Sequence, residues 1–181
     1  VILPMSYSIV HSRGVARAEG QYIAFLDSDD AWFPWTLATV AQVLRESRPA
    51  VVAGRYIDLV DERDLALVAE TPLRASAFDD YLSSSSHPIS AGSGTITVER
   101  AGFQAVGGFF ERPINAQDHD LMLRVGEAGG FGALLSPVTL AWRHHGENVT
   151  ADVARTVAGL EHLIDQERAG AYPGGDRRSR D

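Results

Sequence analysis

Three carboxylates within four positions carry the strongest chemical signal in the sequence. Asp27, Asp29 and Asp30 directly follow the mostly apolar run at residues 21–26. Like charges this close raise one another's pKa, so the cluster costs energy unless a cation neutralises it. Oxygen ligands suit Mg²⁺ or Mn²⁺, and Mg²⁺ is often held by one or two carboxylates together with substrate phosphates. The alternative is that one Asp simply caps a helix beginning near Pro34.

Two further groups of side chains could take part in such a site. Asp118 stands beside Gln117 at the start of an expected helix. There it is either a helix-dipole contact or a general base that takes a proton from an attacking hydroxyl. His144 and His145 follow an apolar run, and a histidine beyond a strand end could be a third metal ligand. A lone histidine is more often structural, so these residues alone leave both interpretations open.

Composition excludes several other kinds of chemistry. The chain has 181 residues, with 16 Lys+Arg against 24 Asp+Glu and a net charge of −8, which argues against a nucleic-acid-binding protein. All the cationic residues are arginine and there is no cysteine, so lysine Schiff bases, thiolate nucleophiles and thiolate metal sites are excluded. No signal peptide is recognisable, and no apolar run approaches the roughly 20 residues that a transmembrane helix needs.

The elements that must position these residues alternate between strand and helix, which predicts an α/β fold. The length suits one domain, assigned to residues 1–168, followed by a disordered Gly/Arg-rich tail at 169–181. The run at 21–26 is typical of a strand buried in a parallel sheet, and ligands on such sheets gather at the carboxyl ends of strands. Further strands are expected at 50–60, 65–68, 95–98 and 133–142, and helices at 34–48, 99–105, 118–128 and 150–168.

Three segments, in the same order along the chain, resemble family 2 glycosyltransferases with the GT-A fold. Residues 17–34, RAEGQYIAFLDSDDAWFP, closely resemble the DXD region of that family. Residues 107–111, GGFFE, followed by 117–124, QDHDLMLR, are similar to its GGF(D/E)E segment and ED-x-DL helix. Residues 142–145, WRHH, followed by 148–150, NVT, are similar to its Y-R-x-H…S ending. Together the matches cover roughly residues 10–150.

The resemblance implies a fold and a reaction. The fold would be a GT-A-like, Rossmann-like mixed sheet flanked by helices. The reaction would be inverting transfer of a sugar from a nucleotide-diphosphate sugar to an acceptor hydroxyl. Asp27 and Asp29 would hold Mg²⁺ or Mn²⁺ and the donor, with Asp29 the more direct ligand and His145 a third. Asp118 would be the general base, and Arg13 would contact the donor.

The resemblance also implies a biological setting. The acceptor would be a carbohydrate or glycolipid, in bacterial surface polysaccharide or glycoconjugate assembly. The location would be cytoplasmic, with peripheral association at the inner membrane face as a further option.

The sequence departs from the family pattern in three places. Gln117 replaces a glutamate, and His11-Ser12 replace an Arg-Asn pair. The opening strand and the V-D-D-G-S segment are missing, so an N-terminally truncated domain is expected, with an exposed sheet edge through which it could form a homo-oligomer. The alternative function is that of a catalytically inactive truncated remnant acting as a binding or interaction domain. A HAD-type phosphatase is disfavoured because Ala31 breaks its motif and lysine is lacking.

Overall fold

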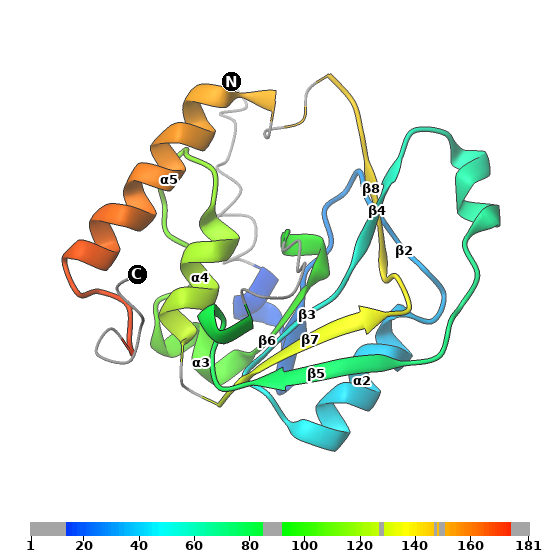
Figure 1. Cartoon of the computed structure of the whole chain (residues 1–181), viewed down its shortest axis with the longest axis horizontal. Helices are drawn as coiled ribbons and strands as arrows, with labels where there is room; N and C mark the ends of the chain where they lie inside the picture. Colours follow the sequence, from blue (N-terminus) through cyan, green and yellow to red (C-terminus); the bar gives the residue numbers. More distant parts are fainter. Residues whose placement is uncertain (1–13, 85–91, 127–128, 147, 149–150, 175–181) are drawn as a thin grey trace.

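The computed structural model describes residues 14–84, 92–126, 129–146, 148 and 151–174, which form two sheets with helices around them (Figure 1). The larger sheet has the order β1-β6-β3-β7-β5 and the smaller one the order β2-β8-β4. The five strands of the larger sheet are β1 (Tyr22–Ala24), β6 (Ile96–Glu99), β3 (Val51–Ala53), β7 (Phe131–Ser136) and β5 (Arg74–Phe78). The β3–β7 pair is parallel and the other three pairs are antiparallel, so the sheet is mixed, as expected.

Helices cover both faces of the larger sheet. Val51 packs in a core with Phe103 and Leu121 of α3 (Arg100–Ala105) and α4 (Gln117–Val125), whereas its neighbour Val52 packs with Val43 of α2 (Thr36–Ser47). This alternation is the period of two that a strand imposes on its side chains. Figure 1 shows α3, α4 and α5 (Val153–Arg168) on one side of the molecule and α2 apart from them. The predicted architecture, a mixed sheet flanked by helices, is confirmed.

The smaller sheet consists of β2 (Ala31–Trp32), β8 (Leu140–Arg143) and β4 (Tyr56–Leu59). It forms because each of the long strands expected at 50–60 and 133–142 divides in two and contributes to both sheets. At Gly54, between β3 and β4, a Cβ atom would lie 2.3 Å from the Thr139 hydroxyl oxygen. At Pro137, between β7 and β8, the backbone has no N–H for a ladder. The chain therefore crosses from one sheet to the other at these two points.

Other predicted elements need correction. Residues 65–68 are not a strand: Glu62–Leu67 form a 3₁₀ helix, η1, which begins at a capping box between Asp61 and Asp64. Strand β1 lies at the end of the sheet order and pairs antiparallel with β6, rather than inside a parallel sheet. Two further 3₁₀ turns, η2 (Leu82–Ser84) and η3 (Ser93–Thr95), lie at the two ends of the Ser/Gly-rich stretch of sequence at 83–94.

Helix α5 packs through the side that carries Gly159 and not through its apolar residues. Val153, Val157, Leu160 and Ile164, which repeat at helical spacing, are 49–72% exposed, while Gly159 is buried against the preceding part of the chain. Tyr172 lies in the segment expected to be disordered, yet it is 4% exposed and hydrogen-bonded to α4. No helix in the described part of the chain is long and apolar enough to cross a membrane.

Candidate active site

The acidic residues after β1 are folded into one tight turn. The Asp30 backbone N–H donates to the Asp27 carbonyl oxygen over 3.2 Å, which closes a four-residue turn. The turn follows the carboxyl end of β1, and β2 begins immediately after it. The three carboxylates are thereby gathered in a short loop that joins the two sheets.

Each of these carboxylates has a partner from a distant part of the chain. The Ser93 hydroxyl of η3 donates to Asp27 Oδ2 over 2.8 Å. His145 Nε2 and Asp29 Oδ2 lie 2.8 Å apart, although the residues are 116 positions apart in the sequence. The Arg143 backbone N–H donates to Asp30 Oδ1 over 3.0 Å. The end of β8 and the η3 turn therefore fix the acidic loop from two sides.

Arg143 anchors the same loop through its side chain. Its Nε donates to the Asp29 backbone carbonyl over 2.8 Å, and its guanidinium pairs with Glu62 of η1. The guanidinium thus bonds the backbone of Asp29 and leaves the Asp29 carboxylate facing His145.

Asp30 is the carboxylate of the loop whose pKa is most affected by its surroundings. Burial, together with the charges of Asp29 and Asp27, raises the pKa of Asp30 to about 6, against an opposing hydrogen bond from the Arg143 backbone. A carboxyl group that titrates near neutral pH beside two others is a group that a cation would stabilise in its charged form.

The donor atoms of the acidic loop suit a divalent cation, although they are not arranged as a finished metal centre. Among the described residues, no three His, Cys, Asp or Glu side chains are already arranged as a metal centre. Asp29 and His145 instead face each other through a hydrogen bond. Carboxylate oxygens with one imidazole nitrogen are nevertheless a donor set that suits Mn²⁺, and the charges of Asp27 and Asp29 add to the effect of burial in raising the pKa of Asp30. The residues present therefore fit a divalent cation.

Asp118 occupies the first turn of α4, where it was expected. The residue two positions before it, Ala116, has φ +69° and so lies in the left-handed region that non-glycine residues seldom adopt. Gln117, which replaces the family glutamate, is buried and donates through Nε2 to the Arg112 carbonyl over 2.9 Å. The strained turn and this amide bond together set the direction in which α4 begins.

Tyr81 and His119 form a pair beside Asp118. The Tyr81 hydroxyl and His119 Nδ1 are 2.6 Å apart, and the Tyr81 ring packs edge-on against Phe131 of β7. Burial, and then the negative charge of Asp118, raises the pKa of Tyr81 to about 12, while burial lowers the pKa of His119. Both groups are therefore neutral at physiological pH.

A buried carboxylate on α4, that of Asp120, joins this helix to its neighbours. Asp120 is 1% exposed and accepts hydrogen bonds from Arg124 Nε at 2.7 Å and from the Tyr172 hydroxyl at 2.9 Å. Arg124 also donates to the carbonyl oxygens of Val106 and Gly108, so it ties the glycine turn to α4. The hydrogen bonds of Asp120 and Arg124 thus join α4 to the turn at Gly108 and to Tyr172 after α5.

The structure brings some of the predicted site residues together and leaves one undescribed. His145 contacts Asp29, and Asp27 lies in the same four-residue turn, where it contacts Ser93. Asp118 lies on α4 beside Tyr81, and Arg13 lies outside the described residues. Sequence reasoning did not assign Ser93, Arg143 or Tyr81 to the site. Arg143 stood inside a recognised motif, and Ser93 in the Ser/Gly-rich loop, so both had a weak signal.

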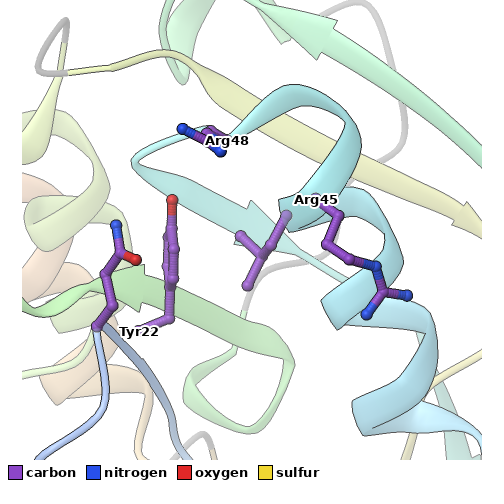
Figure 2. Close-up of a pocket in the computed structure, with 5 residues that line it drawn as sticks. Tyr22, Arg45 and Arg48 are labelled. Atoms are coloured by element: carbon purple, nitrogen blue, oxygen red, sulfur yellow. The ribbon is translucent and has the colours of Figure 1, made fainter.

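A surface hollow of about 350 Å³ lies at the other end of β1. It is lined by Gln21, Tyr22, Leu44, Arg45 and Arg48. Figure 2 shows the Tyr22 hydroxyl directed toward Arg48, while the Arg45 guanidinium points away from it. Because Tyr22 begins β1 and the acidic loop follows its end, this hollow is separate from the candidate active site.

Solved structures with a similar fold include three of S. aureus TarS. The structure of TarS residues 1–349 has a TM-score of 0.56 and 17% identity, over 75% of this chain and 40% of that one. Its complex with UDP-GlcNAc has a TM-score of 0.55 and 15% identity, over 77% and 39%. A longer TarS structure has a TM-score of 0.59 and 14% identity, over 88% and 27%. The present chain thus spans well under half of the length of these proteins.

Sequence comparison gives the family. No curated protein matches the chain significantly. The model of the family described as "Glycosyltransferase like family 2" matches residues 4–164, which is most of the chain and includes every site residue described above. The protein therefore belongs to glycosyltransferase-like family 2.

Proposed function

We propose that the chain transfers a sugar from a nucleoside-diphosphate sugar to a hydroxyl of a carbohydrate or glycolipid acceptor, with inversion at the anomeric carbon. A divalent cation, Mn²⁺ or Mg²⁺, would be held by Asp27, Asp29 and His145. When bound, it would supply positive charge for the leaving diphosphate. Support comes from the family membership and from the similarity in fold to TarS, whose structures include complexes with UDP and UDP-GlcNAc.

One observation carries the proposal: His145 and Asp29 meet at 2.8 Å across 116 positions of sequence. An exposed ion pair of this kind contributes little to stability, because solvent screens the charges. Three carboxylates in one short loop, met by an imidazole from a distant segment, instead concentrate negative charge that a bound cation would balance. Arg143 strengthens this interpretation, since it holds the loop by backbone contacts and leaves the Asp29 carboxylate to its partner.

Asp118 would accept the proton of the acceptor hydroxyl. One of its carboxylate oxygens is buried, and burial raises the pKa of the neighbouring Tyr81 and lowers that of His119, so both of these neighbours are neutral. The strained backbone at Ala116 and the buried Gln117 amide would keep its side chain in one direction. Because the hydroxyl oxygen would displace the diphosphate directly, no covalent intermediate with the protein is needed.

The proposal is tested first by donor binding. We would measure thermal stabilisation of the chain by UDP, GDP and dTDP, each with and without Mn²⁺, in wild type and in Asp29→Asn. The expected result is stabilisation that needs both the metal and one particular nucleotide and that disappears in the variant. If every nucleotide leaves the melting temperature unchanged in both metal conditions, the chain has no working donor site and the proposal fails.

A further inference from the structure

The smaller sheet has two faces of different character. On one face Phe33, Leu59 and Ala141 are buried in a core of their own. The opposite face carries Tyr56 of β4 and Trp142 of β8. Because β4 and β8 run parallel with Asp58 opposite Trp142, the side chain of Asp58 joins this second face.

The second face carries three rings that meet edge to face, beside one pair of polar side chains. The rings of Tyr56 and Trp142 lie 5.5 Å apart at 77°, and those of Trp142 and His144 lie 4.2 Å apart at 61°. His144 Nε2 and Asp58 Oδ1 are 2.9 Å apart. The side chains of His144 and Asp58 are 45% and 62% exposed, so this pair stands in solvent at the edge of the rings. We call these four residues the aromatic face.

The aromatic face adjoins the candidate active site along two paths. His144 belongs to the aromatic face, and the next residue, His145, contacts Asp29. Trp32 of β2 pairs with Leu140, two positions before Trp142, and so lies on the same side of the sheet as the aromatic face. It donates through Nε1 to the Gly94 carbonyl over 2.9 Å, and the neighbouring Ser93 donates to Asp27. The aromatic face and the acidic loop are therefore linked at the end of β8 and at the η3 turn.

The side chains of the aromatic face suit a sugar ring better than a phosphate group. A pyranose ring has an apolar C–H side that packs against aromatic rings, and hydroxyl groups at its rim that bond to carboxylate and imidazole groups. A phosphate group would instead meet the Asp58 carboxylate, and repulsion by the acidic loop would add to this cost. We propose that Tyr56, Asp58, Trp142 and His144 form the subsite that binds a saccharide ring of the acceptor. This inference rests on the proposed function, because it places the acceptor beside the donor site.

The test uses saturation-transfer NMR on the whole chain with a panel of small sugars. The panel contains methyl glycosides and disaccharides of glucose, galactose, mannose and N-acetylglucosamine, without metal or nucleotide. We expect transfer to the C–H protons of one ring face for at least one sugar, and a ten- to hundred-fold loss of affinity in Trp142→Ala.

Asp58→Asn and His144→Gln alter exposed side chains that do not support the core, so they should fold and weaken binding several-fold. Leu160→Ser, on the exposed face of α5, is the control for unspecific apolar contact and should leave binding unchanged.

The outcomes separate the subsite from the donor site. If no sugar in the panel binds, or if binding survives in Trp142→Ala or in both polar variants, the subsite is overturned. A second measurement uses UDP-GlcNAc with Mn²⁺: if a sugar signal appears only there and is lost in Asp29→Asn, the ring belongs to the donor, which overturns the acceptor assignment. If nucleotide binding fails while Trp142-dependent sugar binding persists, the proposed function fails and the subsite stands.

Discussion

Gly159 of α5 lies directly against the backbone of Asn115: a Cβ atom at Gly159 would be 2.2 Å from the Asn115 carbonyl oxygen. Two hydrogen bonds accompany this approach, from the Asn115 N–H to the Arg155 carbonyl at 3.1 Å and from Asn115 Nδ2 to the Thr156 hydroxyl at 2.8 Å. Helix α5 therefore supports the turn that leads through Ala116 into α4 and Asp118. A helix distant from Asp118 in the sequence helps to set the position of the proposed base.

Replacing Gly159 by alanine should break this contact. The added methyl group cannot be accommodated without moving backbone, so we expect a loss of about 2 kcal/mol or more in the free energy of unfolding, measured with urea. Gly102→Ala in α3 is the matched control, since its Cβ would meet only Val125 at 3.8 Å. There alanine should be neutral or stabilise the chain by up to about 1 kcal/mol. Equal effects of the two substitutions would show that α5 does not pack as described.

Asp118→Asn tests the proposed general base. The amide keeps the size of the side chain but cannot accept a proton, so transfer should slow by about 10²- to 10⁴-fold while donor binding is retained. Sugar transfer would be followed by release of the nucleoside diphosphate, and donor binding by calorimetry. Asp165→Asn on α5, which pairs at the surface with Arg168, serves as the charge-matched control. Near-normal transfer by the Asp118 variant would remove this residue from the role of base.

His145→Gln tests the proposed cation site, and the adjacent histidine provides its control. His145 contacts Asp29, whereas His144 contacts Asp58 on the aromatic face. Loss of a ligand should weaken Mn²⁺ binding at least about ten-fold in His145→Gln, as measured by electron paramagnetic resonance of free Mn²⁺. His144→Gln should leave the Mn²⁺ affinity unchanged. The site would be wrongly assigned if both variants bound Mn²⁺ as tightly as wild type.

Asp30 should make stability depend on pH in a direction opposite to that of most carboxylates. Its pKa is raised in the folded chain from 3.8 to about 6, so the charged form is disfavoured by folding. The stabilising contribution of the protonated form is complete below pH 4 and is lost as the pH rises through 6.

The measurement compares Asp30→Asn with wild type in urea unfolding between pH 4 and pH 7, with chelator present. Asparagine keeps the oxygen that accepts the Arg143 N–H but carries no charge. Wild type should lose about 1–2 kcal/mol relative to the variant over this range, because solvent screening reduces the effect at a half-buried site. Two parallel stability curves would contradict the shifted pKa.

The acidic loop could be predicted from the sequence because its residues are contiguous and follow an apolar run. The pairing of Asp29 with His145 depended on motif resemblance, since nothing in a single sequence indicates a contact across 116 positions. The sequence did not predict that the two long strands divide. Gly54 and Pro137 allow the chain to leave the larger sheet, but it does so only because β4 and β8 pair in a second sheet.

Other features had no local signal at all. Ala116 gives no hint of a positive φ, because alanine seldom adopts one and tertiary contacts from α5 impose it here. The apolar residues of α5 repeat on one face of the helix, yet they are exposed, and the helix is held instead through Gly159 and by hydrogen bonds to Asn115. Hydrophobic periodicity finds the helix correctly, yet it does not determine which side packs when small and polar residues make the closer contact.

Tyr172→Phe tests whether the segment after α5 belongs to the folded domain. Burial, and then the bond to Asp120, raises the pKa of Tyr172, so its hydroxyl stays protonated and donates to a carboxylate that is 1% exposed. Removing that donor should cost about 1–3 kcal/mol in urea unfolding, because a buried charged acceptor loses a hydrogen bond. Tyr22→Phe, whose hydroxyl faces the surface hollow of Figure 2, is the control and should change stability by less than about 0.5 kcal/mol. Equal stability of Tyr172→Phe and wild type would mean that Asp120 relies on its contacts with Arg124 and His162, and that the terminal segment adds nothing to the support of α4.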